Sequence, residues 1–159
     1  MPVALRDPRS SARTRSWLEA AYREWLMEIG ASTEEVAAAG RQLAALLSAP
    51  RNEAAVFERD QELAGFALLR REPGAGNVTR HVLLDFFVVP RMRRLGVGGE
   101  AARLLFDRFV GQWEISALTS DVAALAFWRR VLSRYAPARN TESREAGRVR
   151  QCFDNRGPR

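Results

Sequence analysis

The stretch that most restricts how this chain can fold is residues 82–105, VLLDFFVVPRMRRLGVGGEAARLL. It begins as an apolar strand, passes through three arginines and a glycine-rich turn, and continues as an amphipathic helix. Free backbone N–H groups at a helix N-terminus bind anions, and glycines let a phosphate approach the main chain closely. The stretch therefore predicts a diphosphate site between a strand and a helix.

Two other phosphate-binding motifs are excluded by spacing and composition. Residues 96–101 satisfy the dinucleotide pattern G-x-G-x-x-A, but in that fold the first glycine follows its strand almost at once. Here residues 90–95 intervene, and a tight dinucleotide turn has no room for them. A Walker A loop needs a lysine after its last glycine, and this chain contains no lysine. An ordinary solvated loop is the remaining alternative.

The glycine turn has a specific spacing. Arg93, Gly96 and Gly98 form R-x-x-G-x-G, and the strand before them ends in Phe-Val-Val-Pro at residues 87–90. In these residues the chain resembles the GNAT superfamily of acyl-CoA N-acyltransferases, whose main signature is Q/R-x-x-G-x-G/A after an apolar-Val-x-Pro strand end. The resemblance is strongest over residues 82–135 and extends more weakly over most of the chain.

A second motif supports the resemblance. Asp121, Ala124, Phe127 and Trp128 occupy the places of the family pattern N-x-x-A-x-x-F-Y, with two of the four positions substituted. Asp121 can still cap the following helix, because aspartate and asparagine both accept from early backbone N–H groups. Trp128 departs more seriously from the pattern, since an indole N–H cannot protonate a leaving thiolate as tyrosine does.

The order of elements predicts an α/β fold. Helices are expected over 10–29, 32–50, 97–110 and 121–135, and strands over 54–59, 62–71, 78–89, 113–119 and 148–154. The resemblance implies a single GNAT-like domain over residues 1–159, with a mixed, splayed sheet of six to seven strands flanked by about four helices. Residues 1–8 and 154–159 are expected to be flexible ends, and no strand is readable within 136–147.

Composition limits the other classes of function. The chain has 159 residues, 47% of them hydrophobic, and can bury one compact core. No apolar stretch approaches the roughly 20 residues that cross a bilayer, and no signal peptide is apparent, so we expect a cytoplasmic protein without a membrane partner. The single Cys152 and the single His81 give no basis for a metal site. We expect His81 at the surface and Cys152 as a buried small residue.

The net charge of +6, carried entirely by arginines on the basic side, indicates an anionic partner. The three phosphates of CoA would suit this charge, and so would nucleic acid. Arginine without lysine, together with abundant alanine, is also typical of proteins from GC-rich genomes, which weakens the case for nucleic acid.

The resemblance implies acetyl-CoA as the cofactor and assigns its contacts. The pantetheine arm would pair with the backbone of residues 86–88, much as an added strand does. The expected cofactor-binding residues are Phe86, Phe87, Val88, Arg93, Arg94, Leu95, Gly96, Val97, Gly98 and Gly99, together with Asp121, Phe127 and Trp128 of the second motif.

Transfer of an acyl group to an amine requires a base, because an alkyl ammonium has a pKa near 10. Asp85 interrupts an apolar strand one residue before the expected pantetheine contacts, and it is the first candidate. Glu58 and Glu114 on neighbouring strands are alternatives, and a solvated or arginine-paired carboxylate is the structural alternative for Asp85. Tyr135, on the same helix as Trp128, is the candidate acid, with core packing as its alternative.

The sequence thus predicts an acetyl-CoA-dependent N-acetyltransferase that moves an acetyl group directly to a primary amine of a small molecule or protein. Tyr22, Trp25 and Glu28, on the first predicted helix, are expected at the acceptor site. A CoA-binding module with weak or no catalysis is the first alternative, and an arginine-rich nucleic-acid-binding protein is the second. A monomer and a homodimer are both compatible with the sequence.

Overall fold

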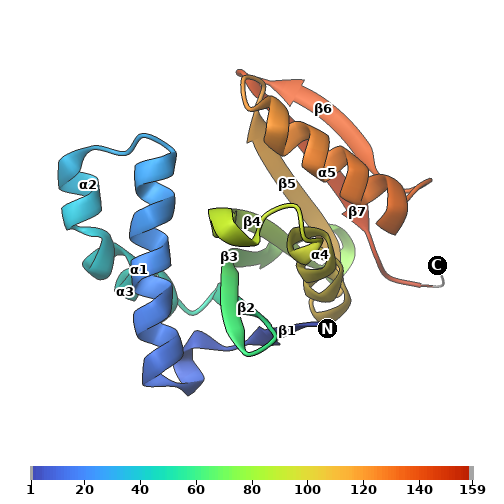
Figure 1. Cartoon of the computed structure of the whole chain (residues 1–159). Helices are drawn as coiled ribbons and strands as arrows, with labels where there is room; N and C mark the ends of the chain where they lie inside the picture. The colour runs from blue at the N-terminus through green and yellow to red at the C-terminus, as the bar shows by residue number, and fades with distance from the viewer. Residues whose placement is uncertain (1, 158–159) are drawn as a thin grey trace. The chain divides into compact units, whose positions relative to one another are not determined.

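Seven strands form one mixed sheet in the order β1-β2-β3-β4-β5-β7-β6 (Figure 1). The computed structural model describes residues 2–157. The strands are β1 (Val3–Arg6), β2 (Asn52–Arg59), β3 (Glu62–Pro73), β4 (Thr79–Val88), β5 (Gln112–Leu118), β6 (Thr141–Glu145) and β7 (Arg148–Asp154). The helices are α1 (Ala12–Glu28), α2 (Thr33–Ala37), α3 (Ala39–Ser48), α4 (Val97–Arg108) and α5 (Val122–Tyr135).

The chain divides into two compact units, which are described separately. The first unit comprises the residues up to Leu69 together with Asp85–Ala101, and the second comprises Arg70–Leu84 and the residues from Ala102 onward. Strands β3 and β4 contribute to both. The parallel ladder between β4 and β5 pairs residues 80–82 with 112–114, inside the second unit.

In the first unit, α1 begins and ends where its sequence predicts. The Ser11 side chain accepts a hydrogen bond from Thr14 N, and Gly30, with φ +81°, adopts the left-handed conformation that ends the helix. The buried face of α1 consists of Leu18, Ala21, Tyr22 and Leu26. This face follows the helical period, and α1 packs against α3 (Figure 1).

The helix expected over 32–50 is interrupted at Ala38. Ser32 caps α2 as predicted, accepting from Glu35 N at 3.1 Å, but α2 has only five residues and buries none of them. The separate helix α3 buries Ala39 and Leu43. Of the two segments, only α3 therefore contributes buried residues to the core.

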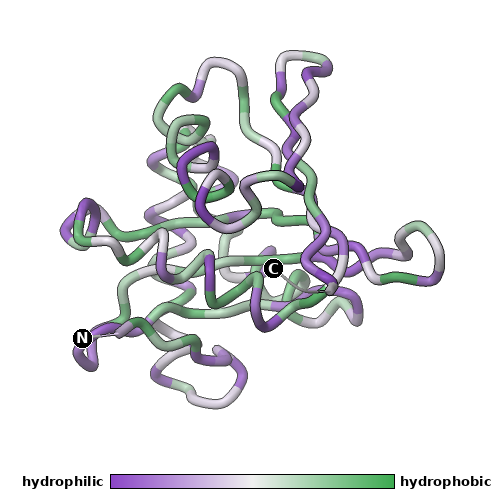
Figure 2. The backbone as a smooth tube through the Cα atoms, turned by 90° about the vertical axis from the view of Figure 1, so that its right-hand side faces the viewer, coloured by the Kyte–Doolittle hydropathy of each residue, from purple (hydrophilic) through white to green (hydrophobic). Residues whose placement is uncertain are grey.

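The hairpin between β2 and β3 is confirmed, with its turn at Asp60 and Gln61. Both turn residues have positive φ, 53° and 66°, the backbone of a two-residue turn that matches the twist of paired strands. Residues 54–57 and 63–69 of the two strands are buried. Figure 2 shows that the backbone alternates between hydrophobic stretches, in green, and hydrophilic stretches, in purple.

The expected flexible ends are wrong at several positions. Residues 3–6 form β1, which pairs antiparallel with β2, and Val3 is buried. At the other end, Asn155 is buried, accepts a hydrogen bond from Gly111 N at 2.8 Å and donates one to Phe106 O at 2.6 Å. Residues 1, 158 and 159 lie outside the described part of the chain.

In the second unit, β6 is the strand that the sequence did not predict. All five of its residues are exposed, and it pairs antiparallel with β7. Because both of its faces meet water, it lacks the alternation of apolar and polar residues that identifies a half-buried strand. The helix and strand bounds of α5 and β7 agree with the predicted ranges within one residue.

The expectation for His81 is wrong. Its side chain is buried between the rings of Phe109 and Trp113, with 3% of the residue exposed. Nε2 lies 3.1 Å from Val110 O, so this histidine forms a hydrogen bond with the backbone of the segment that connects α4 and β5. Burial lowers its pKa below the ordinary 6.5. Cys152 is partly buried, and burial raises the pKa of its thiol.

Candidate active site

The turn from β4 into α4 has the backbone of an anion site. Val89 N donates to Ala64 O at 2.8 Å, after which a short 3-10 turn leads into the glycine segment. Arg94 and Gly96 have positive φ, 64° and 80°, so the chain reverses sharply before α4 begins. A side chain added at Gly96 or Gly99 would meet nothing within 4 Å. Open space therefore lies beside Gly96 and Gly99, and the N–H groups of a helix's first turn have no partner inside the helix and can bind an anion.

Arg93, the first residue of the R-x-x-G-x-G pattern, is held by the protein itself. Its Nε donates to Val88 O at 2.8 Å, and its Nη2 donates to both carboxylate oxygens of Glu28 at 2.8 Å each. The guanidinium also lies over the Phe87 ring, 5.3 Å from the centroid. The structure thus joins Arg93, which is expected to bind the pyrophosphate, to Glu28, which is expected at the acceptor site. The positive charge of one is paired with the negative charge of the other.

Two further contacts brace the same loop within the first unit. The Arg59 guanidinium donates to Leu95 O, and the Glu100 carboxylate accepts from Val3 N at 2.9 Å. Sequence analysis missed Arg59 and Glu100, since no local pattern connects β1 or β2 with this loop. Leu95 itself is 55% exposed, as befits a residue at the rim of an open turn.

Asp85 stands out among the candidate bases. It lies on β4, partly buried, and within residues 2–157 its carboxylate has no ion pair or hydrogen bond. Burial raises its pKa from the ordinary 3.8 to about 6. The Tyr22 phenol, whose pKa rises to about 12 through its own burial and then through the charge of Asp85, lies close enough to interact. A carboxylate with this pKa is ionised at neutral pH and accepts a proton more readily than a solvated one.

The two alternative bases are both ion-paired. Glu58 accepts from the Arg6 guanidinium at 3.0 Å in the first unit, and Glu114 accepts from Arg150 at 3.3 Å in the second. Each of these carboxylates is already engaged by a guanidinium, whereas, within the described residues, that of Asp85 is not. Their geometry therefore suits a base less well than that of Asp85.

The expected acceptor residues Tyr22 and Trp25 belong to an aromatic cluster in the first unit. Their rings stack at 5.6 Å, both contact Phe66 edge-on at 6.2 and 6.5 Å, and Phe66 contacts Phe87 at 5.7 Å. Tyr22 is 1% exposed, whereas Trp25 is only partly buried. Of the two, Trp25 offers more surface to a bound molecule.

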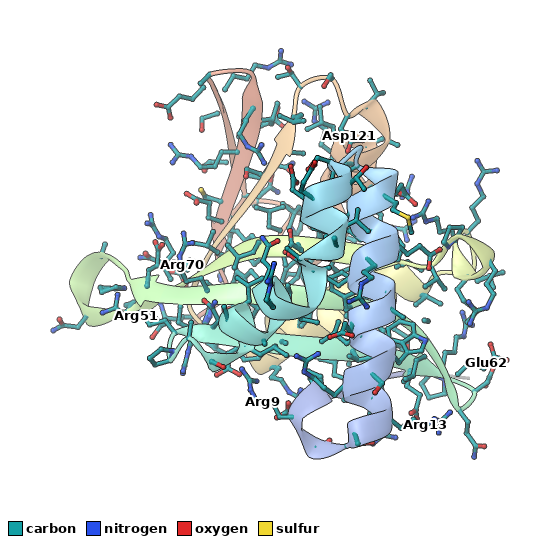
Figure 3. All side chains as sticks on the ribbon, turned by 90° about the vertical axis from the view of Figure 1, so that its left-hand side faces the viewer. Arg9, Arg13, Arg51, Glu62, Arg70 and Asp121 are labelled. Atoms are coloured by element: carbon teal, nitrogen blue, oxygen red, sulfur yellow. The ribbon has the colours of Figure 1, made fainter. Side chains whose placement is uncertain are left out.

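The second motif lies in the second unit. Asp121 caps α5 by accepting from Ala124 N at 3.1 Å, as predicted, and Figure 3 labels it at the start of that helix. Trp128 is buried against the edge of Phe127, with ring centroids 4.8 Å apart. That Asp121, Phe127 and Trp128 contact the cofactor stays a prediction.

Tyr135, the candidate acid, is engaged in structural contacts. Its hydroxyl donates to the Asp107 carboxylate at 2.8 Å and accepts from Asn155 Nδ2 at 3.4 Å. Its ring packs against Phe106 and Phe153. The geometry favours the packing role over proton donation.

Neither metal-binding clusters nor membrane helices occur in the described part of the chain. Within residues 2–157, no three His, Cys, Asp or Glu side chains come together so as to hold a metal ion. No helix in the same range combines the length and the hydropathy needed to span a bilayer.

Comparison with known proteins decides the family. The model of the acetyltransferase (GNAT) family matches residues 12–132, more than half of the chain. The chain belongs to this family. Membership of the GNAT family confirms the predicted class of acyl-CoA-dependent N-acetyltransferases and leaves the acceptor open. No curated protein matches the sequence significantly.

Solved structures confirm the GNAT fold. An acetyltransferase from Thermus thermophilus superposes with a TM-score of 0.72 at 16% identity, covering 97% of each chain. The ribosomal-protein-S18-alanine N-acetyltransferase from Escherichia coli gives 0.64 at 14% identity, covering 96% of this chain and 93% of its own. The PaiA N-acetyltransferase from Thermoplasma acidophilum, solved with coenzyme A, gives 0.62 at 13% identity, covering 97% and 99%.

Proposed function

We propose that this GNAT protein transfers an acetyl group from acetyl-CoA directly to a primary amine, with Asp85 as the base. The observation that carries the proposal is the partly buried carboxylate of Asp85, which has no ion pair or hydrogen bond with residues 2–157 and has a pKa of about 6. It lies on the same strand as residues 86–88 and ahead of a turn that can hold a diphosphate. Perturbed carboxyl groups in such places serve acid–base chemistry.

The residues present fit acetyl-CoA, which supplies an acetyl group activated as a thioester. The first-turn N–H groups of α4 would hold the diphosphate, and the space beside Gly96 and Gly99 gives it room. Each such dipole contact contributes about 0.3–2 kcal/mol, so useful affinity needs several donors together. Residues 86–88 would orient the pantetheine arm through their backbone.

Asp85 has a defined task in this mechanism. An alkyl amine is protonated at neutral pH, and Asp85 accepts the proton that the amine must lose, directly or through water. A CoA thiol resembles a cysteine thiol, with a pKa near 8.5, so it leaves reasonably well as a thiolate without a dedicated acid. This explains how the chain can function with Trp128 in the usual place of tyrosine.

Small amines and protein amines both remain candidate acceptors. The Escherichia coli neighbour is named for alanine acetylation on a ribosomal protein, which supports a protein amine as one possibility. The Thermoplasma acidophilum neighbour was solved with coenzyme A, which supports the cofactor. The observed ion pairs weaken the nucleic-acid alternative, because many arginines already have acidic partners: Arg6, Arg9, Arg23, Arg70, Arg80, Arg93, Arg103, Arg129, Arg150 and Arg156.

The test combines cofactor binding with turnover. Acetyl-CoA is expected to raise the melting temperature, and an amine panel is expected to release free thiol. Gly99→Glu and Gly99→Gln place side chains of equal size in the open space at the start of α4, and the glutamate variant should bind acetyl-CoA more weakly, because its charge repels the phosphates. Binding without thiol release would support the non-catalytic module, and a salt-sensitive DNA complex without a response to acetyl-CoA would refute the proposal.

A further inference from the structure

The contact between Glu28 and Arg93 connects two segments that are 65 residues apart in sequence. Glu28 is the last residue of α1, and Arg93 follows the 3-10 turn after β4. Both contacts of Nη2 with the carboxylate measure 2.8 Å, and the two side chains are 44% and 41% exposed. The pair therefore links the end of the predicted acceptor helix to the start of the turn at residues 93–99, which is proposed to hold the cofactor and is called the cofactor turn below.

Arg93 also contacts the backbone of β4. Its Nε donates to Val88 O, and its guanidinium covers the Phe87 ring. With Nε on a carbonyl and Nη2 on a carboxylate, the planar guanidinium is fixed at two of its nitrogens. Arg93 thereby fixes the direction in which β4 ends and the glycine turn begins.

We propose that Glu28 is a positioning residue that acts through Arg93 to set the cofactor turn before acetyl-CoA binds. In this arrangement the Glu28 carboxylate is bound to Arg93, so its effect on the turn is exerted through that side chain. Without it, Arg93 loses its fixed orientation, and the turn must be ordered at the expense of binding free energy. The inference rests on the proposed use of acetyl-CoA by this site.

A positioning role of Glu28 and a direct role of Arg93 predict opposite changes in cofactor affinity when the charge of Glu28 is removed. If the Arg93 side chain were itself a phosphate ligand, Glu28 would compete with the phosphate, and removing its charge would strengthen cofactor binding. If Glu28 positions Arg93, removing its charge weakens binding. Glu28→Gln keeps the size of the side chain and removes the charge, so it separates the two.

The experiment measures CoA dissociation constants by calorimetry for wild type, Glu28→Gln, Arg93→Gln and the double variant. We expect each single variant to bind about fivefold more weakly, the equivalent of about 1 kcal/mol for an exposed ion pair. The double variant should bind no more weakly than either single variant, because both remove the same interaction. In kinetics, Glu28→Gln should raise the KM for acetyl-CoA by a larger factor than it changes kcat at saturation.

Glu19→Gln is the matched control. Glu19 lies on the same helix and pairs with Arg23 at 3.1 Å, with similar exposure of 37% and 39%, but it does not contact the cofactor turn. It should leave CoA binding unchanged. Equal or tighter CoA binding by Glu28→Gln would overturn the inference, as would an equal effect of Glu19→Gln. A wild-type protein that does not bind CoA would instead refute the proposed function.

Discussion

Replacing Asp85 by asparagine is expected to stabilise the protein and to slow acetyl transfer strongly. Burial raises the pKa of Asp85 from 3.8 to about 6, so the ionised form is less favourable in the folded chain than in the unfolded chain. A difference of about two pKa units corresponds to about 3 kcal/mol. Because the residue is only partly buried, solvent screening reduces this to about 1–2 kcal/mol.

The sign of the pH dependence follows from the raised pKa. Below pH 3.8 Asp85 is protonated in both states, and Asp85→Asn should be about as stable as wild type. Between pH 3.8 and about 6 the unfolded state loses the proton first, so wild type loses stability relative to the variant. Above pH 6 the variant's gain in stability over wild type is complete. Each kcal/mol of this gain should raise the melting temperature by about 2–4 °C.

Activity should change in the other direction. Loss of a general base typically slows turnover about 10²–10⁴-fold, whereas CoA binding should be unaffected. In wild type, kcat/KM should rise with pH through an apparent pKa of about 6. The assays are thermal unfolding from pH 4 to 8 and thiol release over the same range.

Glu58→Gln serves as the control, because Glu58 is already paired with Arg6 and should show neither effect. The reasoning would be refuted if Asp85→Asn kept wild-type turnover at pH 7. A gain in stability that did not depend on pH would equally refute burial of the charge as its cause.

Three further variants test the structural assignments. Tyr135→Phe removes the hydrogen bond to Asp107 and should cost about 1 kcal/mol of stability with unchanged turnover; lost turnover at full stability would restore Tyr135 as the acid. Gly65→Ala would place Cβ 2.2 Å from Phe87 O and should destabilise the fold by about 1–3 kcal/mol or more in denaturant titrations. Burial lowers the pKa of His81, so its contribution to stability should be lost as pH falls below 6.5; the difference between wild type and His81→Gln in urea unfolding should shrink toward acid pH, and a constant difference would contradict this.

Elements with a local signal could be predicted from the sequence. The turn at Asp60, the cap at Asp121 and the bounds of β7 follow from turn chemistry, capping and alternation. Strands β1 and β6 could not be predicted in the same way. They are edge strands stabilised by backbone pairing with a neighbour; β1 has only four residues, too few to show a period, and β6 is exposed along its whole length and shows no apolar alternation.

The residues of the candidate site likewise differ in whether the local sequence could identify them. Asp85 could be singled out because a charged residue interrupts an apolar strand, and the glycine turn because of its spacing. The contact of Arg93 with Glu28 and the burial of His81 depend on which distant segments meet. Neither is encoded in the residues adjacent in sequence, so neither could be found before the fold was known.

The surroundings of the carboxylates give the strongest argument for the site. In a chain with 25 arginines and 19 acidic residues, a carboxylate on the sheet readily finds a guanidinium, as Glu58 and Glu114 do. Asp85 has no such partner within residues 2–157, although pairing would lower its pKa and remove its cost to stability. A guanidinium beside it would also take away its capacity to accept a proton near neutral pH. The lack of pairing is thus unfavourable for folding and favourable for acetyl transfer, which is the combination expected of a catalytic base.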